Sequence, residues 1–147
     1  MVTQELIKPT LEELFEQAVE NYNALVCSTL GFLNLHQISI LEYAHFIGKQ
    51  YAESWTPDIT PFKLARGMAF NFMSVGAKLE ALGGDEHESH LAITGWPNLE
   101  LLTAYSGRLE DVDKFTQLVS KIAEYQNCSF EMKRQGERLD IYFRRKK

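Results

Sequence analysis

The sequence has few cysteines, few prolines and no long apolar run. Its 147 residues include 2 cysteines and 4 prolines. Two cysteines cannot build a disulfide framework, which excludes the class of small disulfide-stapled secreted domains. No apolar run reaches the ~18–20 residues that a membrane-spanning helix needs. The first residues also lack the charged-then-apolar pattern of a secretory signal. These absences predict a soluble cytoplasmic protein with no membrane partner.

Basic residues are outnumbered as well. The chain has 15 Lys and Arg against 20 Asp and Glu, a net charge of −5. A nucleic-acid-binding protein normally carries a basic surplus, so we expect no nucleic-acid partner. Seven of the basic residues lie in residues 131–147. We interpret this end as a solvated terminal strand and tail, and contact with phosphate or an acidic partner is the alternative.

What is present in quantity is apolar and aromatic. Hydrophobic residues make up 45% of the chain and aromatic residues 12%. This composition is typical of globular proteins, and the length is typical of one domain with one core. The sequence therefore predicts a single domain over residues 1–147.

The first half of the chain predicts three helices. The S/T-x-x-E capping box occurs at Thr10 and again at Ser39, and it marks the start of a helix. Thr60 followed by proline marks a third start. The first helix should extend to about residue 33, and Pro57 should stop the second. The third should continue to Gly83-Gly84, because glycine readily adopts the left-handed conformation that ends helices.

The second half mixes strands with helices. The side chains of residues 87–95 alternate between two faces, as in a strand. Asn98 is a candidate cap for a short helix that extends to Tyr105. Residues 110–126 have an amphipathic helical pattern. Residues 128–143 alternate around a turn at Gln135-Gly136, which predicts a hairpin. The fold class is therefore α+β: three N-terminal helices, then β-α-α-β-β. The three strands should form a small antiparallel sheet packed on helices.

The densest polar cluster is residues 85–90, which contains His87 and His90 among acidic residues. Histidines and carboxylates can bind zinc, so a metal-assisted hydrolase is one hypothesis. Histidines three apart along a strand point to opposite faces, however. We interpret the cluster as a solvated connection from helix to strand and predict no metal ligand and no catalytic residue.

Three further side chains are candidates for acid–base or nucleophilic chemistry. His36 and His45 lie near the junction of the first two helices and could act as an acid or base. Cys27 lies in the middle of an apolar helix, away from the positive charge or helix N-terminus that activates a thiol. We expect hydrogen-bonded histidines and an inert thiol.

Aromatic residues are concentrated in the helical half and just after the strand. Aromatic-lined clefts between helices commonly hold apolar ligands. We therefore predict a ligand site between the second helix, the third helix and the strand at 87–95, formed by Tyr51, Trp55, Phe70 and Trp96. Arg66 would lie at its polar end and could hold a carboxylate through two hydrogen bonds. The alternatives are an ordinary aromatic core and a surface salt bridge for Arg66.

The element order, with Gly95-Trp96-Pro97 after the strand, LVSKIAEY at 118–125 and Asn127-Cys128-Ser129-Phe130 opening the hairpin, resembles the vinyl-4-reductase-type domain over residues 10–144. That fold is shared with trafficking-complex subunits and is related to heme nitric-oxide-binding domains. The resemblance implies a small-molecule-binding domain that pairs through N-terminal helices. The paired cysteines of the family are reduced here to Cys128, and neither His36 nor His45 has a heme-ligand motif around it.

We thus expect a non-catalytic sensor or ligand-carrier domain for a small apolar or carboxylate-bearing molecule. The sequence names no cofactor. A homodimer is expected, because three helices with broad apolar faces exceed what a small sheet can cover. The alternatives are the hydrolase that uses His87 and His90 and a structural adaptor whose helical faces bind a partner.

Overall fold

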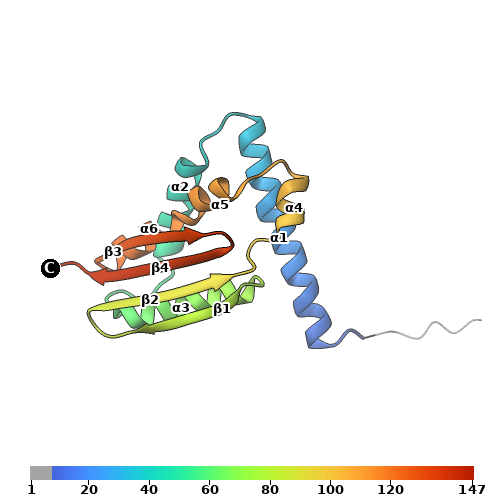
Figure 1. Cartoon of the computed structure of the whole chain (residues 1–147). Helices are drawn as coiled ribbons and strands as arrows, with labels where there is room; N and C mark the ends of the chain where they lie inside the picture. Colours follow the sequence, from blue (N-terminus) through green and yellow to red (C-terminus); the bar gives the residue numbers. More distant parts are fainter. Residues whose placement is uncertain (1–7) are drawn as a thin grey trace, which may run out of the picture.

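The structure is a computed structural model that describes residues 8–147, and it is a mixed α+β fold (Figure 1). Three helices come first: α1 (Leu11–Leu35), α2 (Ile40–Ala52) and α3 (Pro61–Ser74). They are followed by β1 (Lys78–Gly84), β2 (Glu88–Thr94), α4 (Leu99–Ala104), α5 (Leu109–Thr116), α6 (Leu118–Tyr125), β3 (Cys128–Gln135) and β4 (Arg138–Arg145). The α+β class and the three leading helices agree with the sequence prediction.

The sheet is antiparallel and has the strand order β1-β2-β4-β3. Each outer strand forms a hairpin with its sequence neighbour, and the two hairpins join through β2 and β4. In the register of these inner strands, Leu91 lies opposite Ile141 and His90 opposite Tyr142. Because successive side chains alternate between faces, the first pair and the second pair point to opposite sides of the sheet.

The helices cover one face of this sheet (Figure 1). Helices α3 and α6 pack on the strands, and α2 packs on α5 and α6. Leu91, Ile93, Ile141 and Phe143 are fully buried beneath these helices. One hydrophobic core results, with residues from all six helices of the described region. Helix α1 lies along the side of the molecule and contacts α4 and α2.

The sequence prediction was wrong about residues 78–84, which form strand β1 and not the end of a long third helix. Helix α3 ends at Ser74, and Gly76 follows with φ +97°. The N–H of Ala77 donates to the Phe72 carbonyl and that of Gly76 to the Met73 carbonyl. This is the Schellman arrangement, and glycine favours its left-handed position. The sheet therefore has four strands where three were expected.

Two further boundaries differ from expectation. The amphipathic stretch at 110–126 is two short helices, α5 and α6, which meet at Gln117. Residues 85–87 connect strand to strand, not helix to strand. Asp85 shapes that turn, because its carboxylate accepts hydrogen bonds from the backbone N–H groups of His87 and Glu88 at 2.8 and 3.0 Å.

The helix starts agree with the sequence. Thr10, Ser39, Thr60 and Asn98 are N-caps, and the side chain of each accepts a hydrogen bond from a backbone N–H in the first turn. In the described region, no helix combines the length and the apolarity needed to cross a membrane.

Two buried amide side chains join distant segments. Gln126 is fully buried; its Oε1 accepts from the Ile59 N–H at 3.1 Å, and its Nε2 donates to the Thr56 carbonyl at 2.8 Å. Asn23 donates to the Val75 carbonyl at 3.1 Å and accepts from the Asn98 N–H at 3.0 Å. These bonds fix the α2–α3 connection on the end of α6, and α1 on the segments that follow α3 and β2.

We expect Gln126→Leu to lower the free energy of unfolding by about 1–3 kcal/mol, because backbone groups at residues 56 and 59 lose their partners. Urea denaturation measures the change. Gln50→Leu, at an exposed position of α2, is the control and should change stability by less than about 0.5 kcal/mol. Equal losses in the two variants would mean that the Gln126 bonds contribute nothing of their own.

Candidate functional site

A largely apolar cavity of about 360 Å³ lies where α1, α2, α3, α5 and α6 meet. Its volume falls within the ~300–1,000 Å³ of small-molecule sites. Six aromatic residues contribute to the lining: Tyr22, Tyr51, Trp55, Phe72, Trp96 and Phe115. The remainder is mostly aliphatic: Met68, Val75, Leu118, Val119 and Ile122, with Ser54, Asn71, Ser74 and Thr116.

The lining divides into a buried floor and an exposed rim. Phe72, Trp96 and Val119 are among the floor residues and are at most 7% exposed. Tyr22 and Tyr51 are 39% and 52% exposed and lie at the rim, together with Ser54, Asn71 and Ser74. The cavity is therefore apolar at its base and amphipathic at its opening.

Trp55 is positioned by a glycine on the neighbouring helix. A Cβ added at Gly67 would lie 2.7 and 2.8 Å from two atoms of the Trp55 six-membered ring. The indole therefore lies directly against the backbone of α3, which only glycine permits. Gln126 also fixes the α2–α3 connection, which contains Trp55, through hydrogen bonds with the backbone of Thr56 and Ile59.

Trp96 comes from the segment that leaves β2. Its ring packs edge-on against Phe72 with 5.4 Å between centroids. The side chain is 6% exposed, and its buried Nε1 has no hydrogen-bond partner among residues 8–147. A buried unpaired donor is costly, by about 1–3 kcal/mol. An acceptor placed beside it would remove that cost.

The cavity contains no formal charge: within residues 8–147, none of the side chains that line it belongs to Lys, Arg, His, Asp or Glu. Burial raises the pKa of the Tyr22 phenol above its ordinary value of 10.0, and the nearby phenols of Tyr51 and Tyr43 raise it further. The Tyr22 phenol is therefore a neutral hydrogen-bonding group at neutral pH. This site suits a neutral, mostly apolar molecule.

The structure brings together three of the five residues that the sequence grouped. Tyr51, Trp55 and Trp96 line the cavity, whereas Arg66 and Phe70 do not. Arg66 is exposed on α3, with its guanidinium carbon 4.8 Å from the centroid of the Phe70 ring. Residues four apart share a helix face, and this face is not the one that carries Met68 and Phe72. The expected place of Arg66 at the polar end of the cavity is therefore corrected.

The sequence also misassigned one wall. The cavity borders on α5 and α6 through Phe115, Leu118, Val119 and Ile122, whereas no residue of strand β2 lines it. The amphipathic pattern of 110–126 predicted helix and a buried face, but the pattern alone does not say which other helices that face meets. Tyr22 also lines the cavity, although it was not among the residues predicted for the site.

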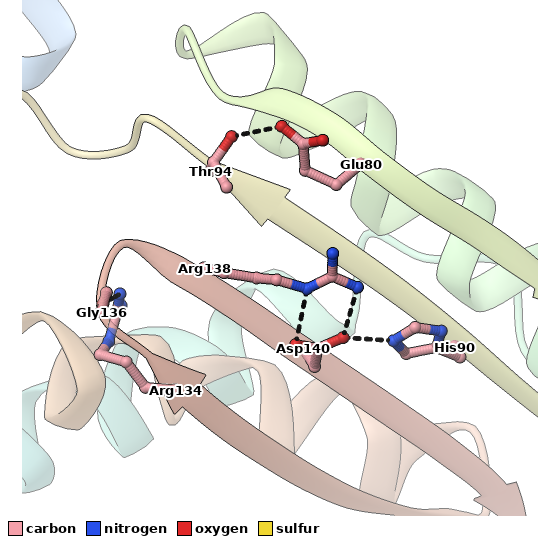
Figure 2. Close-up of polar contacts among 7 residues, drawn as sticks. All are labelled: Glu80, His90, Thr94, Arg134, Gly136, Arg138 and Asp140. Atoms are coloured by element: carbon pink, nitrogen blue, oxygen red, sulfur yellow. Dashed lines mark hydrogen bonds and ion pairs between the residues drawn. The ribbon is translucent and has the colours of Figure 1, made fainter.

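A second polar cluster lies on the face of the sheet that the helices leave open, and Figure 2 shows it. Arg138 contacts the Asp140 carboxylate through Nε at 3.1 Å and Nη2 at 3.2 Å. His90 Nε2 lies 2.7 Å from the same carboxylate, and its ring stacks on Tyr142. Hydrogen bonds and charge from Arg138, and then His90, hold the pKa of Asp140 below its ordinary value of 3.8. Because the carboxylate stays ionised, His90 Nε2 is the donor.

This cluster bears on the hydrolase alternative. An Asp–His pair can orient a general base, but acyl transfer also needs a nucleophile in contact with the histidine. Asp140 is the hydrogen-bond partner that the described structure gives His90, and that partner is already engaged by Arg138. His87 is exposed in the turn before β2, paired at 3.3 Å with Glu86. In the described residues, no group of three His, Cys, Asp or Glu is arranged to hold a metal ion.

The remaining candidates lie apart from both places. Cys27 and Cys128 are free and buried, and burial raises the pKa of both thiols above the ordinary value of 9.0. Thiols of this kind are poor nucleophiles at neutral pH. His36 is exposed at the end of α1, where its ring contacts Phe32.

Comparison of the sequence with models of known protein families gives no match, and comparison with curated proteins gives no match either. A function for this chain is therefore inferred from the geometry of the cavity and of the Asp140 cluster.

The Asp140 cluster predicts a pH-dependent stability. We expect Asp140→Asn to lower the free energy of unfolding by about 1.5–3 kcal/mol at pH 7, as for hydrogen bonds to charged groups. A lowered pKa in the folded state means that the carboxylate stabilises above pH 3.8. That contribution is lost as the pH falls below 3.8 and through the lower folded-state pKa.

Urea denaturation at pH 7 and at pH 3 measures the difference between wild type and variant, which should shrink at pH 3. The control is Glu131→Gln, which removes an exposed carboxylate 3.8 Å from Lys133 on the same face. Such a pair contributes at most about 1 kcal/mol. A pH-independent difference for Asp140→Asn would contradict the prediction.

Proposed function

We propose that the chain is a non-catalytic binding domain, a sensor or a ligand carrier, for a small, neutral and largely apolar molecule that occupies the cavity among the helices. The observation that carries the proposal is a buried apolar floor that includes Trp96, with the partly buried Trp55 also in the lining, and an uncharged, amphipathic rim. Ligand pockets have this composition: mainly apolar and aromatic, with a few polar groups that orient the ligand. The resemblance to vinyl-4-reductase-type domains supports the same assignment.

The polar groups refine the ligand's chemistry. The buried floor offers apolar contacts to one end of the ligand. The rim phenols and Asn71 can meet polar atoms at the other end. A carboxylate on the ligand would enter a site where no cation compensates for its lost hydration, which is costly. The neutral member of the two expected ligand classes is therefore favoured.

We expect 1-anilinonaphthalene to bind more tightly than its 8-sulfonate, by about tenfold or 1.4 kcal/mol. The two probes differ by one anionic group, so the comparison isolates the effect of charge. Both tryptophans line the cavity, so energy transfer from tryptophan to probe reports binding. Arg66→Ala should leave the neutral probe's affinity unchanged, because Arg66 lies outside the cavity.

Two results would contradict the proposal. One is the absence of saturable binding by the neutral probe. The other is tighter binding of the sulfonate that is lost in Arg66→Ala, which would restore Arg66 as the anion-holding residue.

A glycine substitution tests whether the cavity is the site. Gly67→Ala forces the Trp55 indole away from α3, because the new Cβ would lie 2.7 Å from a ring atom. We expect the affinity for 1-anilinonaphthalene to fall about tenfold, with a change in tryptophan emission. The fold should survive, because alanine is favoured over glycine in a helix by about 1 kcal/mol.

The matched control is Gly83→Ala in β1, where an added Cβ would meet no atom of the described region within 4 Å. It should leave affinity and emission unchanged. Equal effects of the two substitutions, or no effect of Gly67→Ala on a probe that does bind, would place the binding site elsewhere.

A further inference from the structure

Helix α1 presents an apolar row to solvent on a face that is not its buried face. The buried side chains of α1 are Asn23, Val26, Cys27, Leu30 and Leu33. A different set is exposed, including Phe15 at 51%, Leu25 at 65% and Phe32 at 56%. Figure 1 shows α1 along the side of the molecule, with α4 beside only part of its length.

The exposed set has the spacing of a helix–helix seam. Steps of four and three residues alternate without a break through what we call the α1 row: Leu11, Phe15, Ala18, Tyr22, Leu25, Thr29, Phe32 and His36. Thr29 is partly buried and the other seven are exposed. An average step of 3.5 residues is the signature of helices that pack lengthwise on one another. Leu14 and Leu35 are also exposed and widen the row.

Charge is missing where an exposed helix normally carries it. Residues 21–35 of α1 contain no charged side chain, although a surface helix usually has a charged outer face. The row has seven large exposed apolar side chains, counting those that flank it. At on the order of 100 Å² for each half-exposed side chain, they approach the ~800 Å² per partner of a stable interface.

We infer that the α1 row is an interface with the α1 row of a second copy of this chain, with the two helices antiparallel. The spacing of the row is symmetric about a midpoint between residues 23 and 24, so an antiparallel copy aligns each position of the row with another position of the row. Phe15 would therefore meet Phe32 of the partner subunit, and Tyr22 would meet Leu25 of the partner subunit. A two-fold axis requires this self-complementarity.

The helix macrodipole favours the antiparallel arrangement, because the dipoles of two helices that lie side by side attract one another only when they point in opposite directions.

This interface would complete the opening of the cavity. Tyr22 belongs both to the α1 row and to the cavity rim. In the antiparallel pair, the partner's Leu25 lies against Tyr22 at that rim. A second copy would therefore contribute an apolar side chain to the mouth of each cavity, and the two symmetric cavities would open towards the shared helix pair.

The first test is mass by light scattering over a concentration series. We expect a dimer for the wild type and a monomer for Leu25→Glu with Phe32→Glu, whose helical circular dichroism should be retained because both positions are exposed. The matched control is Phe46→Glu on α2, where the side chain is 65% exposed but lies outside the row. A monomeric wild type, or a Phe46→Glu monomer beside a dimeric double variant, would overturn the inference.

The second test fixes the direction of the helices. Phe15→Cys and Phe32→Cys proteins, mixed under oxidised glutathione, should form a disulfide-linked dimer that contains one copy of each. Neither protein alone should crosslink efficiently. Efficient crosslinking of each variant with itself would show a parallel pair and contradict the antiparallel assignment. Neither test involves a ligand, so failure here is distinguishable from failure of the proposed binding function.

Discussion

The hydrogen bonds of the buried Asn23 side chain hold together the parts of the chain that enclose the cavity. The amide donates to the Val75 carbonyl, just past the end of α3, and accepts from the Asn98 N–H, two residues after Trp96. Tyr22 is the preceding residue on α1, so the Asn23 side chain sets the relative positions of the cavity rim, of α3 and of the segment that carries Trp96. Gln126 does the same for the Trp55 segment. Each tryptophan is thus placed by a buried amide from a distant part of the sequence.

A sheet covered by helices on one face accounts for the rest of the architecture. The inner strands bury Leu91 and Ile141 beneath α3 and α6, and α2 forms a further layer on α6. Helix α1 is left at the side, with one face on the core and the α1 row in solvent. Two surfaces thereby remain: the open sheet face, whose Asp140 cluster is already internally paired, and the α1 row, most of which is exposed to solvent. The cavity lies at the junction of α1 with the layered helices.

Local signals predicted much of this fold from the sequence, and long-range contacts account for what was missed. The caps at Thr10, Ser39, Thr60 and Asn98 were readable because capping is local chemistry. Residues 78–82, Lys-Leu-Glu-Ala-Leu, favour helix by propensity, yet pairing with β2 makes them a strand. Tyr51, Trp55 and Trp96 were grouped through their aromatic character. Arg66 and Phe70 were grouped with them wrongly, because the sequence pattern alone does not show which face of α3 borders the cavity.

The central claim is that a neutral ligand occupies the cavity beside both tryptophans. The most direct test is the set of nuclear Overhauser effects between bound 1-anilinonaphthalene and the protein. The account predicts contacts from the probe to the indole ring protons of Trp96 and Trp55 and to the ring of Phe72, the residues of the floor and wall. Contacts confined to the exposed side chains of α1, such as Leu11 and Phe32, would show that the probe only covers the helix surface, and the cavity would not be the binding site.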